Sequence, residues 1–584
     1  MTRTDTFVVG TLVLLLALIA GIIGVPALQL SVTSSSSSRQ PDASPSVSQT
    51  RPYVEGALGA PVSVTPLTAS SQIDRDLVAL LYSGLLRNGP RGTVVPDLAE
   101  RWSVDATGTT WTVDLREDAQ WHDGQPVTSE DVLFTVRTLQ DPAYKGPTAT
   151  SWSEVEVSAT GPGQVTFKLD TPLGGFLQAL TQPLAPAHLL ADIPIDALAD
   201  DPFGRQPVGS GPFALVELTD QSASLVPAGD FIAAEDEEGS AGPSTPPATD
   251  SLTTPGPTER PSRPRPYLSG IEFRYYTHPA KLVTDFRGGA LDGVSGITRQ
   301  QAAELAAEPG ARLLRYPGAT LTTVLLNLRP SHPEFASPAV RTALFQSIDR
   351  AALIDTAYAM SAASATGPIP PSSPVFDPAA DPVIPYDRKA ASKALTSAGW
   401  EHKDDGWYLP KAKKPLTVEV VSPTQMTNPA LFAAAEGVVR NWTALGLAVT
   451  HVPLPPAEFV TDRLATGTFQ VAVVDVTIGL DPDLYPLLAS SQTLTGGSNV
   501  MGVQDPELDA LLAKARAPGT DAEREAAYSA LQKRLAAGRY LLPLAFADEV
   551  VVVHDTLEGP VLRQASDPSD RFWDVLTWRL ADGR

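Results

Sequence analysis

The chain has 584 residues, of which 43% are hydrophobic, so it is long enough to form several lobes that each have a core. Its formal net charge of -23 argues against nucleic-acid binding, because neutralising phosphates requires a basic surface. Cysteine is absent, which excludes disulfides, thiolate nucleophiles and thiolate metal sites and leaves the redox compartment open.

The N-terminus carries an apolar run from Phe7 to Val25 whose only clearly polar side chain is Thr11. A run of this length can cross a bilayer, and no clear Ala-x-Ala cleavage site follows it. We therefore expect residues 1–30 to be a retained membrane anchor, with a long cleavable signal peptide as the alternative, and the body to lie outside the cytoplasm. Residues 31–51 have no aromatic residue and many serines, which is typical of a flexible tether.

The first part of the body contains a strand and a capped helix. Ile73 to Leu86 has helical spacing, whereas Thr110 to Arg116 alternates apolar and polar residues as a strand with one buried face does. Thr128 stands three residues before Asp131, a variant of the capping box, and an amphipathic helix follows until Pro142.

A low-complexity segment then interrupts the body. Val165 to Leu169 alternates as a further strand, but Ala233 to Pro266 holds eight prolines and an acidic run, Glu235 to Glu238. The acidic run lacks the spacing of cation ligands, so we predict a disordered insert at 233–266 rather than a metal site. The folded chain resumes with a β-branched and aromatic strand, Ile271 to Tyr276.

The second half alternates helices with strands. Ser337-Pro338 and Asp387 have the residue types that begin helices. From Leu416 to Asp475 the pattern reads strand, helix, strand, helix, strand, with Asn428 as a helix cap, which predicts a parallel sheet covered by helices. Because ligands of such sheets bind beyond the carboxyl ends of the strands, this pattern points at Val476 to Asp483.

Motifs of catalysis are missing. No GxxxxGK[ST], HExxH or GxSxG is present, and the seven histidines are scattered singly. Gly209-Ser210-Gly211 followed by Ala214 matches GxGxxA, but prolines on both sides make it a tight loop rather than a dinucleotide site. We therefore predict a protein that is not an enzyme and that uses no metal and no cofactor.

Several segments together resemble one protein family. In order and spacing, they are similar to the extracytoplasmic solute-binding proteins of family 5, the dipeptide and oligopeptide binders of ABC importers. The resemblance covers roughly Val62 to Leu557, although the lipid-modified cysteine that tethers many relatives is missing. The segments are VVPDLAERW (94–102), WHDGQPVTSEDV (121–132), PVGSGPF (207–213), NLRPSHPEFASPAVRTALFQSIDRAALI (327–354), ATGPIPP (365–371), DRKAASKALTSAGW (387–400) and QDPELDALLAKAR (504–516).

The resemblance implies an α/β fold with two lobes, like the class II periplasmic binding proteins, with an extra inserted domain. The apolar run Phe7 to Val25 adds an N-terminal transmembrane helix before this fold. Lobe I would comprise residues 52–75, 206–315 and 551–584, the inserted domain 76–205, and lobe II 316–550. The lobes would close as a hinge around a small solute and present it to ABC permease subunits. We expect a monomer that binds no nucleic acid.

The resemblance also indicates where the solute binds. In peptide-binding relatives, an acidic residue just before an Asp-Pro or Glu-Pro pair anchors the amino group of the ligand. Here the pair is Asp481-Pro482, and the anchoring position falls on or near Ile478, which carries no charge. Asp475 and Asp481 are the acids nearby that could replace it, since a buried ammonium needs a carboxylate.

Further residues complete the expected site. Backbone groups of Thr477, Ile478, Gly479 and Leu480 would line the cleft from lobe II. The resemblance places Ser70, Ser71 and Gln72 at the pocket from the first lobe, and a plain polar loop is an equal alternative for these three.

Other functions stay open at this point. A membrane-anchored sensor or accessory binding protein is one alternative, and neighbouring genes for permeases and ATPases would favour import over sensing. A hydrolase that uses the same cleft is another, but it needs an activated nucleophile that the sequence does not reveal. Family members carry peptides, sugars, metal chelates or opine-like molecules, so the resemblance does not identify the solute.

Overall fold

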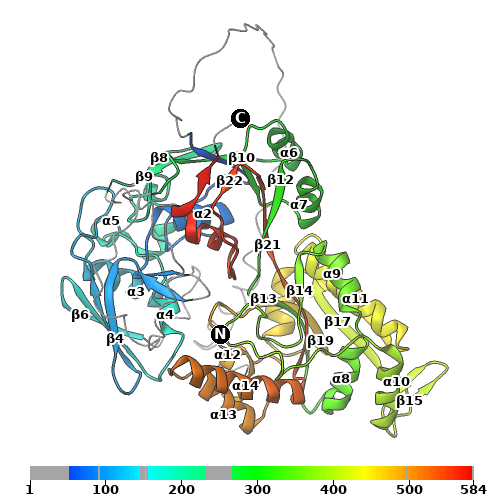
Figure 1. The fold of residues 1–584 in the computed structure, drawn as a ribbon. Helices are drawn as coiled ribbons and strands as arrows, with labels where there is room; N and C mark the ends of the chain where they lie inside the picture. Colours follow the sequence, from blue (N-terminus) through cyan, green and yellow to red (C-terminus); the bar gives the residue numbers. More distant parts are fainter. Residues whose placement is uncertain are drawn as a thin grey trace.

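The computed structural model describes residues 51–89, 93–144, 152, 155–229, 266–493 and 497–581. These residues form two large β-sheets and a smaller third sheet, each with helices packed against it (Figure 1). Within these ranges, no helix combines the length and the apolar character that crossing a membrane requires. The expected anchor, residues 1–30, lies outside the described residues. So do residues 31–50 of the expected tether and residues 233–265 of the expected insert.

The first large sheet has seven strands. In spatial order they are β12 (Ala311–Tyr316), β21 (Glu549–His554), β11 (Gly293–Ser295), β1 (Tyr53–Leu58), β10 (Ile271–Tyr276), β9 (Ser222–Pro227) and β8 (Phe213–Leu218). β1 is parallel to β10 and β11, and the other neighbours are antiparallel. The helices that cover its two faces are α6 (Pro279–Arg287) and α7 (Arg299–Ala306) on one, and α2 (Gln72–Leu81) and the 3-10 helix η9 (Pro568–Thr577) on the other.

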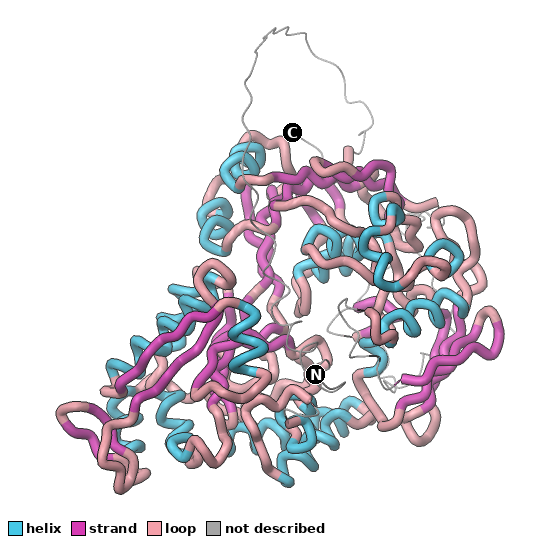
Figure 2. The backbone as a smooth tube through the Cα atoms, turned by 180° about the vertical axis from the view of Figure 1, so that it is seen from behind, coloured by secondary structure: helices cyan, strands magenta, loops and turns pink. Residues whose placement is uncertain are grey.

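The second large sheet has six strands. In spatial order they are β14 (Ala362–Ser364), β20 (Leu541–Ala547), β13 (Thr320–Leu326), β19 (Val471–Thr477), β17 (Thr417–Pro423) and β18 (Ala448–Leu454). Figure 2 shows helices on both of its faces. One face packs against α8 (Pro338–Gln346), α9 (Arg350–Tyr358), α10 (Arg388–Ser397) and α11 (Pro429–Ala444). The other packs against the π-type helix η7 (Glu458–Leu464), α12 (Tyr485–Leu488), α13 (Pro506–Arg516) and α14 (Asp521–Gly538).

The smaller sheet has four antiparallel strands and an aromatic core. The strands are β4 (Ala99–Val104), β5 (Thr110–Leu115), β7 (Gln164–Leu169) and β6 (Val155–Gly161), with α3 (Ser129–Gln140), α4 (Phe176–Ala179) and α5 (Ala187–Leu190) nearby. Phe176 of α4 packs its ring against Trp111 and Phe167, with centroids 5.7 and 5.5 Å away. These contacts fix the short helix α4 and the turn before it to the sheet.

Short elements complete the described chain. They are β2 (Leu86–Asn88), β3 (Val94–Pro96), β15 (Glu401–Lys403), β16 (Gly406–Tyr408), β22 (Leu557–Glu558), β23 (Arg579–Leu580), η4 (Ile195–Asp200), η5 (Pro202–Arg205), η6 (Pro333–Phe335) and η8 (Ser490–Gln492).

Most of the local predictions are confirmed. Thr128 and Asp131 form the capping box that begins α3, and Asn428 caps α11 by accepting the N–H of Leu431. β17 is parallel to both β18 and β19, as the alternation of strands and helices after Leu416 predicts. The antiparallel strands β13, β20 and β14 extend this sheet, so it is mixed rather than purely parallel.

The helix expected at 73–86 is shorter than its apolar pattern suggests. α2 ends at Leu81, and Tyr82 has extended backbone angles. The next apolar residues are buried as an extended segment, and Leu86 begins β2, which pairs with β3. The expectation was wrong because a run of buried apolar residues fits a helix and an extended strand equally well, and long-range pairing decides between them.

The chain crosses between the two large sheets at residues 317–319 and at Asp548. Asp548 donates its N–H to the carbonyl of Ser361 (3.0 Å), and its own carbonyl accepts Nε and Nη2 of Arg299 (3.1 and 2.8 Å). Its carboxylate accepts Nε and Nη2 of Arg315 (2.9 and 2.6 Å). Asp548 therefore binds the six-stranded side through its N–H and the seven-stranded side through its carbonyl and one carboxylate oxygen.

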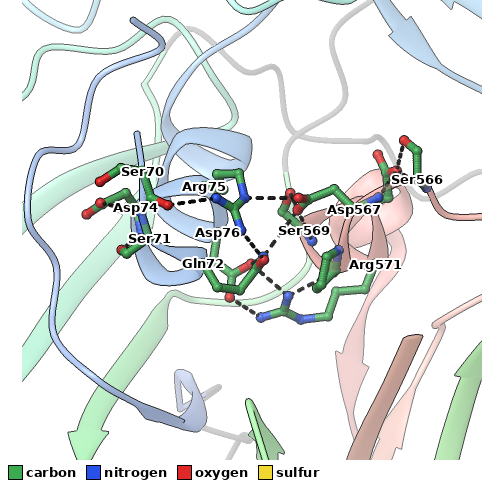
Figure 3. A network of polar contacts seen from close by, with 12 residues as sticks. Ser70, Ser71, Gln72, Asp74, Arg75, Asp76, Ser566, Asp567, Ser569 and Arg571 are labelled. Atoms are coloured by element: carbon green, nitrogen blue, oxygen red, sulfur yellow. Dashed lines mark hydrogen bonds and ion pairs between the residues drawn. The ribbon is translucent and has the colours of Figure 1, made fainter. Parts of the chain in front are cut away.

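A buried ion cluster ties the end of the chain to the first strand and the first described helix (Figure 3). Arg571 of η9 is 2% exposed and donates to Asp76 of α2 (2.8 and 2.6 Å) and to Glu55 of β1 (2.7 Å). Burial alone would lower the pKa of Arg571, but the two carboxylates outweigh it and the pKa is raised. Arg571 thus holds η9 against α2.

We predict that residues 235–263 can be replaced by a short Gly/Ser linker without loss of stability. β9 and β10 pair directly, with Leu225 opposite Ile271, so a short connection reaches from one strand to the other. The melting temperature should stay nearly unchanged in a thermal scan. A fall of more than about 5 °C, roughly a kcal/mol or more for a body of this size, would contradict the prediction.

We predict that Arg571→Met lowers the free energy of unfolding by about 3 kcal/mol at pH 8, because it leaves Glu55 and Asp76 buried without a counter-charge. Burial raises the pKa of the Asp76 carboxyl even with Arg571 beside it, and the loss of the guanidinium removes the main opposing charge. Protonation of Asp76 then stabilises the folded variant as the pH falls, so the loss should shrink at pH 5.

Denaturant titration at both pH values measures this difference. Arg101→Met is the matched control, because Arg101 pairs with Asp114 at the surface with its side chain 69% exposed, and it should leave stability unchanged. A loss of stability in Arg571→Met that is equal at pH 5 and pH 8 would contradict the role of the buried acids.

Candidate functional site

Asp475 lies near the carboxyl end of β19, beyond which the sequence pattern places a ligand. It stands opposite Thr322 of β13 in the strand register, and Thr322 Oγ1 donates to its Oδ1 at 2.6 Å. Asn428 uses its Oδ1 to cap α11, so its Nδ2 is free to donate to Oδ2 of Asp475 at 3.1 Å. Two neutral side chains from different elements thus orient the carboxylate.

Within the described part of the chain, no cationic side chain forms an ion pair with Asp475. Burial raises the pKa of the Asp475 carboxyl, while the hydrogen bonds from Thr322 and Asn428 and the charge of Arg299 act in the opposite direction. The Tyr358 hydroxyl lies 2.6 Å from Thr322 Oγ1 and extends this polar group towards α9. A partly buried carboxylate surrounded by neutral donors is suited to receive a cation.

Arg299 joins this group to the other large sheet. It is the first residue of α7, and its guanidinium is fastened to the carbonyl of Asp548 and lies 5.6 Å from the ring centre of Tyr358. Its charge acts on Asp475 from one side and on Glu549 from the other. Arg299 therefore stands where the two sheets face each other beside the crossing at Asp548.

Glu549 is the first residue of β21, directly after the crossing. Burial raises the pKa of the Glu549 carboxyl, Arg299 opposes this rise, and the charges of Asp567 and Asp548 add to it. Sequence reasoning did not select Glu549 or Arg299, because a single charged residue at a strand or helix start has no recognisable pattern. Their positions emerge only from the folded chain.

Ser70, Ser71 and Gln72 lie at the start of α2 (Figure 3). The Ser71 side chain caps the helix by accepting the N–H of Asp74, and the Ser70 carbonyl accepts Nη1 of Arg75 (3.0 Å). Gln72 donates through Nε2 to Asp76 at 2.8 Å and to Asp567 at 3.2 Å. Gln72 and Asp567 are thus placed together, in the electrostatic neighbourhood of Glu549.

The residues after Asp475 divide between surface and core. Thr477 is exposed and ends β19, and Gly479 has a φ of 80°, a left-handed turn conformation. The side chains of Ile478 and Leu480 are buried, and the N–H of Ile478 donates to the carbonyl of Ala319 at 2.9 Å. Ile478 therefore has no side-chain group or backbone N–H left to bind a ligand.

Asp481 is occupied by another partner. Its carboxylate forms an ion pair with Arg524 of α14, and the neighbouring Asp483 pairs with Arg516 at 3.1 Å. Asp475 and Asp481, which the sequence leaves as equal candidates, are therefore in different electrostatic states. Asp475 is bound by neutral donors, and Asp481 is already neutralised.

A row of Ser422, His451 and Glu436 has the hydrogen-bond order of a hydrolytic triad. Ser422 Oγ lies 2.8 Å from Nε2 of His451, whose Nδ1 contacts the carboxylate of Glu436. Ser422 is fully buried, however, and its hydroxyl also lies 2.9 Å from the carbonyl of Pro423. A substrate carbonyl has no access to that oxygen in this conformation, so the row links β17, β18 and α11 structurally.

The described residues contain no cluster of side chains of the kind that binds a metal ion. Among the residues that the structure describes, no group of three or more His, Asp or Glu side chains is arranged to hold a metal ion. A groove of about 480 Å³ lies between α8 and α10, away from Asp475, and is lined mainly by Ala and Ser. The polar residues around Asp475 and Glu549 are therefore the candidate site.

Comparisons with known proteins all find bacterial solute-binding proteins. The model of the bacterial extracellular solute-binding proteins, family 5, matches residues 93–498. The oligopeptide-binding protein AppA of Bacillus subtilis is 23% identical over 534 residues, which cover 90% of this chain and 91% of AppA. Its solved structure in complex with a nonapeptide superposes with a TM-score of 0.64 at 21% identity, covering 91% of this chain and 99% of that one.

A second solved structure resembles the chain to the same degree. It is NikZ from Campylobacter jejuni in complex with Ni(L-His), with a TM-score of 0.64 at 20% identity over 91% of this chain and 99% of NikZ. These likenesses establish a two-lobed binding-protein fold with mixed α/β content. The two ligands differ in kind, so the fold alone does not specify what is bound.

Proposed function

Because this chain belongs to the family 5 bacterial extracellular solute-binding proteins, we propose that it captures a small peptide-like solute between two hinged lobes and delivers it to the permease of an ABC importer. The observation that carries the proposal of a solute with a free amino group is the environment of Asp475. Its carboxylate is oriented by Thr322 and Asn428, is influenced by the charge of Arg299 from the other large sheet's side, and has no contacting cation among the described residues.

We assign the lobes from the sheets. Lobe I comprises residues 52–75, 206–315 and 551–584, lobe II 316–550, and the inserted domain 76–205. What supports this division is that the described chain passes between the seven-stranded and six-stranded sheets at residues 317–319 and at Asp548, close to these bounds. The four-stranded sheet is built wholly within residues 76–205.

The charges around the site favour a cationic group. Asp475 and Glu549 supply two carboxylates on which the charge of Arg299 acts, whereas Asp567 is already paired with Arg75 at 2.9 Å. An ammonium that leaves water requires such a carboxylate, because an unpaired buried charge costs several kcal/mol. Asp475 takes the role that the charged anchor has in peptide-binding relatives, and Asp481 does not.

Backbone groups contribute the remaining contacts in this proposal. Thr477 and Gly479 lie at the exposed end of β19 and in its turn, where their carbonyls and N–H groups are suited to an extended ligand. From lobe I, Gln72 and the exposed Ser70 complete the site, while Ser71 serves α2 as its cap. The protein works as a monomer without a catalytic step or a cofactor.

We predict that Asp475→Asn weakens binding of free-amino di- and tripeptides by at least about tenfold, ~1.4 kcal/mol, because the ammonium loses its counter-charge. Titration calorimetry with a peptide library measures the affinities. The sharper readout is the affinity ratio between each peptide and its N-acetylated form, which should be large in the parent and fall to about one in Asp475→Asn.

Asp481→Asn is the matched control. It removes one carboxylate three residues from Ile478 and should leave the ratio between free and acetylated peptides unchanged, since Asp481 is paired with Arg524. A parent protein that binds acetylated and free peptides equally well would refute the ammonium site. If the affinity ratio between free and acetylated peptides instead falls to about one in Asp481→Asn, then Asp481 is the residue that binds the ammonium.

The location of the body follows from the family, whose members are extracytoplasmic. We propose in addition that Phe7 to Val25 anchors the chain in the membrane, because it is apolar throughout except for Thr11. N-terminal sequencing of membrane-extracted protein should return the start of the printed sequence. A start near Gln29 to Ser35 would show cleavage and exclude the anchor.

A further inference from the structure

The turn before α4 contacts lobe II. The N–H of Gly174 donates to the carbonyl of Arg516, the last residue of α13, at 2.8 Å. Figures 1 and 2 both show the part of the chain around α4 meeting the ends of α13 and α14, on a side of the molecule away from the crossing strands. The inserted domain thus reaches across to lobe II by a second route, independent of Asp548.

Glycines make this close approach possible. A Cβ at Gly175 would overlap the carboxylate of Asp481, and one at Gly174 would overlap the guanidinium of Arg524 and lie 3.1 Å from the carbonyl of Ala517. In the turn between β4 and β5, a Cβ at Gly108 would lie 2.7 Å from Cγ of Pro518. Both turns of the inserted domain therefore fit against lobe II only because they lack side chains.

The receiving surface of lobe II is held in shape by its own contacts. Asp481 pairs with Arg524, and the guanidinium of Arg516 lies 4.6 Å from the ring centre of Tyr485. The Tyr528 hydroxyl donates to the carbonyl of Pro482 at 2.8 Å. The Asp481-Pro482 turn and the ends of α13 and α14 thus form one firm platform for the glycine turn.

We propose that these two turns and this platform form a latch, which closes the space between the lobes on the side away from the crossing and must open when a solute enters or leaves. The proposal rests on the proposed solute-binding function. One backbone hydrogen bond and the packing of glycines are weak enough to break and re-form as the lobes move. Asp481 therefore serves closure rather than ligand charge.

A disulfide tests the latch, since the chain has no cysteine of its own. A Cβ at Gly108 would lie 3.7 Å from Cβ of Pro518, within the range of a disulfide, so the double variant Gly108→Cys, Pro518→Cys should cross-link on mild oxidation. The oxidised protein, loaded beforehand with a free-amino tripeptide, should release it at least about tenfold more slowly than the same protein after reduction.

Controls separate the latch from strain and from loss of binding. Gly108→Cys alone reports the effect of a side chain at its left-handed φ of 73°. Gly174→Val, Gly175→Val should speed release and enlarge the radius of gyration in X-ray scattering, whereas Gly161→Val, where a Cβ meets nothing within 4 Å, should do neither.

Each outcome decides the proposal. A cross-link that forms but leaves the release rate within about twofold would overturn the latch, as would a pair that never cross-links. If no tripeptide binds, the proposed class of ligand is refuted. The radius of gyration from X-ray scattering still tests the latch in that case. An equal radius of gyration for the parent and the Gly174→Val, Gly175→Val variant would then refute it.

Discussion

Asp548 joins the two large sheets through its N–H, its carbonyl and its carboxylate at once, so that the relative position of the sheets depends on a residue outside both of them. Ser361 binds it from just before β14, and Arg299 and Arg315 bind it from the seven-stranded sheet and its helix. A rotation of one lobe against the other must be absorbed here and at residues 317–319. These three partners are polar and Asp548 belongs to none of the hydrophobic cores, so the contacts at the crossing are separate from the packing on either side.

Arg299 couples this crossing to the candidate site. Its guanidinium binds the carbonyl of Asp548, and its charge partly offsets the carboxylates of Asp475 and Glu549, whose pKa values burial raises. With the lobes apart, water screens these charges, whereas closure would remove that water and strengthen every interaction among them. In the proposed site, a solute cation placed beside Asp475 would then bring a positive charge to a carboxylate that no cationic side chain contacts among the described residues.

The sequence predicts local structure well where the signal is local. The capping box at Thr128, the cap at Asn428 and the strand at Thr110 to Arg116 depend on neighbouring residues, and all three are confirmed. The end of α2 and the antiparallel strands of the second sheet depend on partners far along the chain, which periodicity does not encode. The same limit applies to the site, because Asp475 and Arg299 meet only across the two sheets.

The two aspartates near Ile478 show how folding distributes functions that the sequence leaves equal. Asp475 is held by neutral donors and has no contacting cation among the described residues, whereas Asp481 is paired with Arg524 beneath the glycine turn of the inserted domain. A solute can shift the lobes only by as much as it binds the closed arrangement better than the open one. In the proposed site, an ammonium at Asp475 gains this difference when Glu549 of the seven-stranded sheet and Gln72 of lobe I approach, while the proposed latch at Asp481 favours closure without any solute. In the two proposals, ligand charge and lobe closure are therefore carried by different residues, Asp475 and the platform around Asp481.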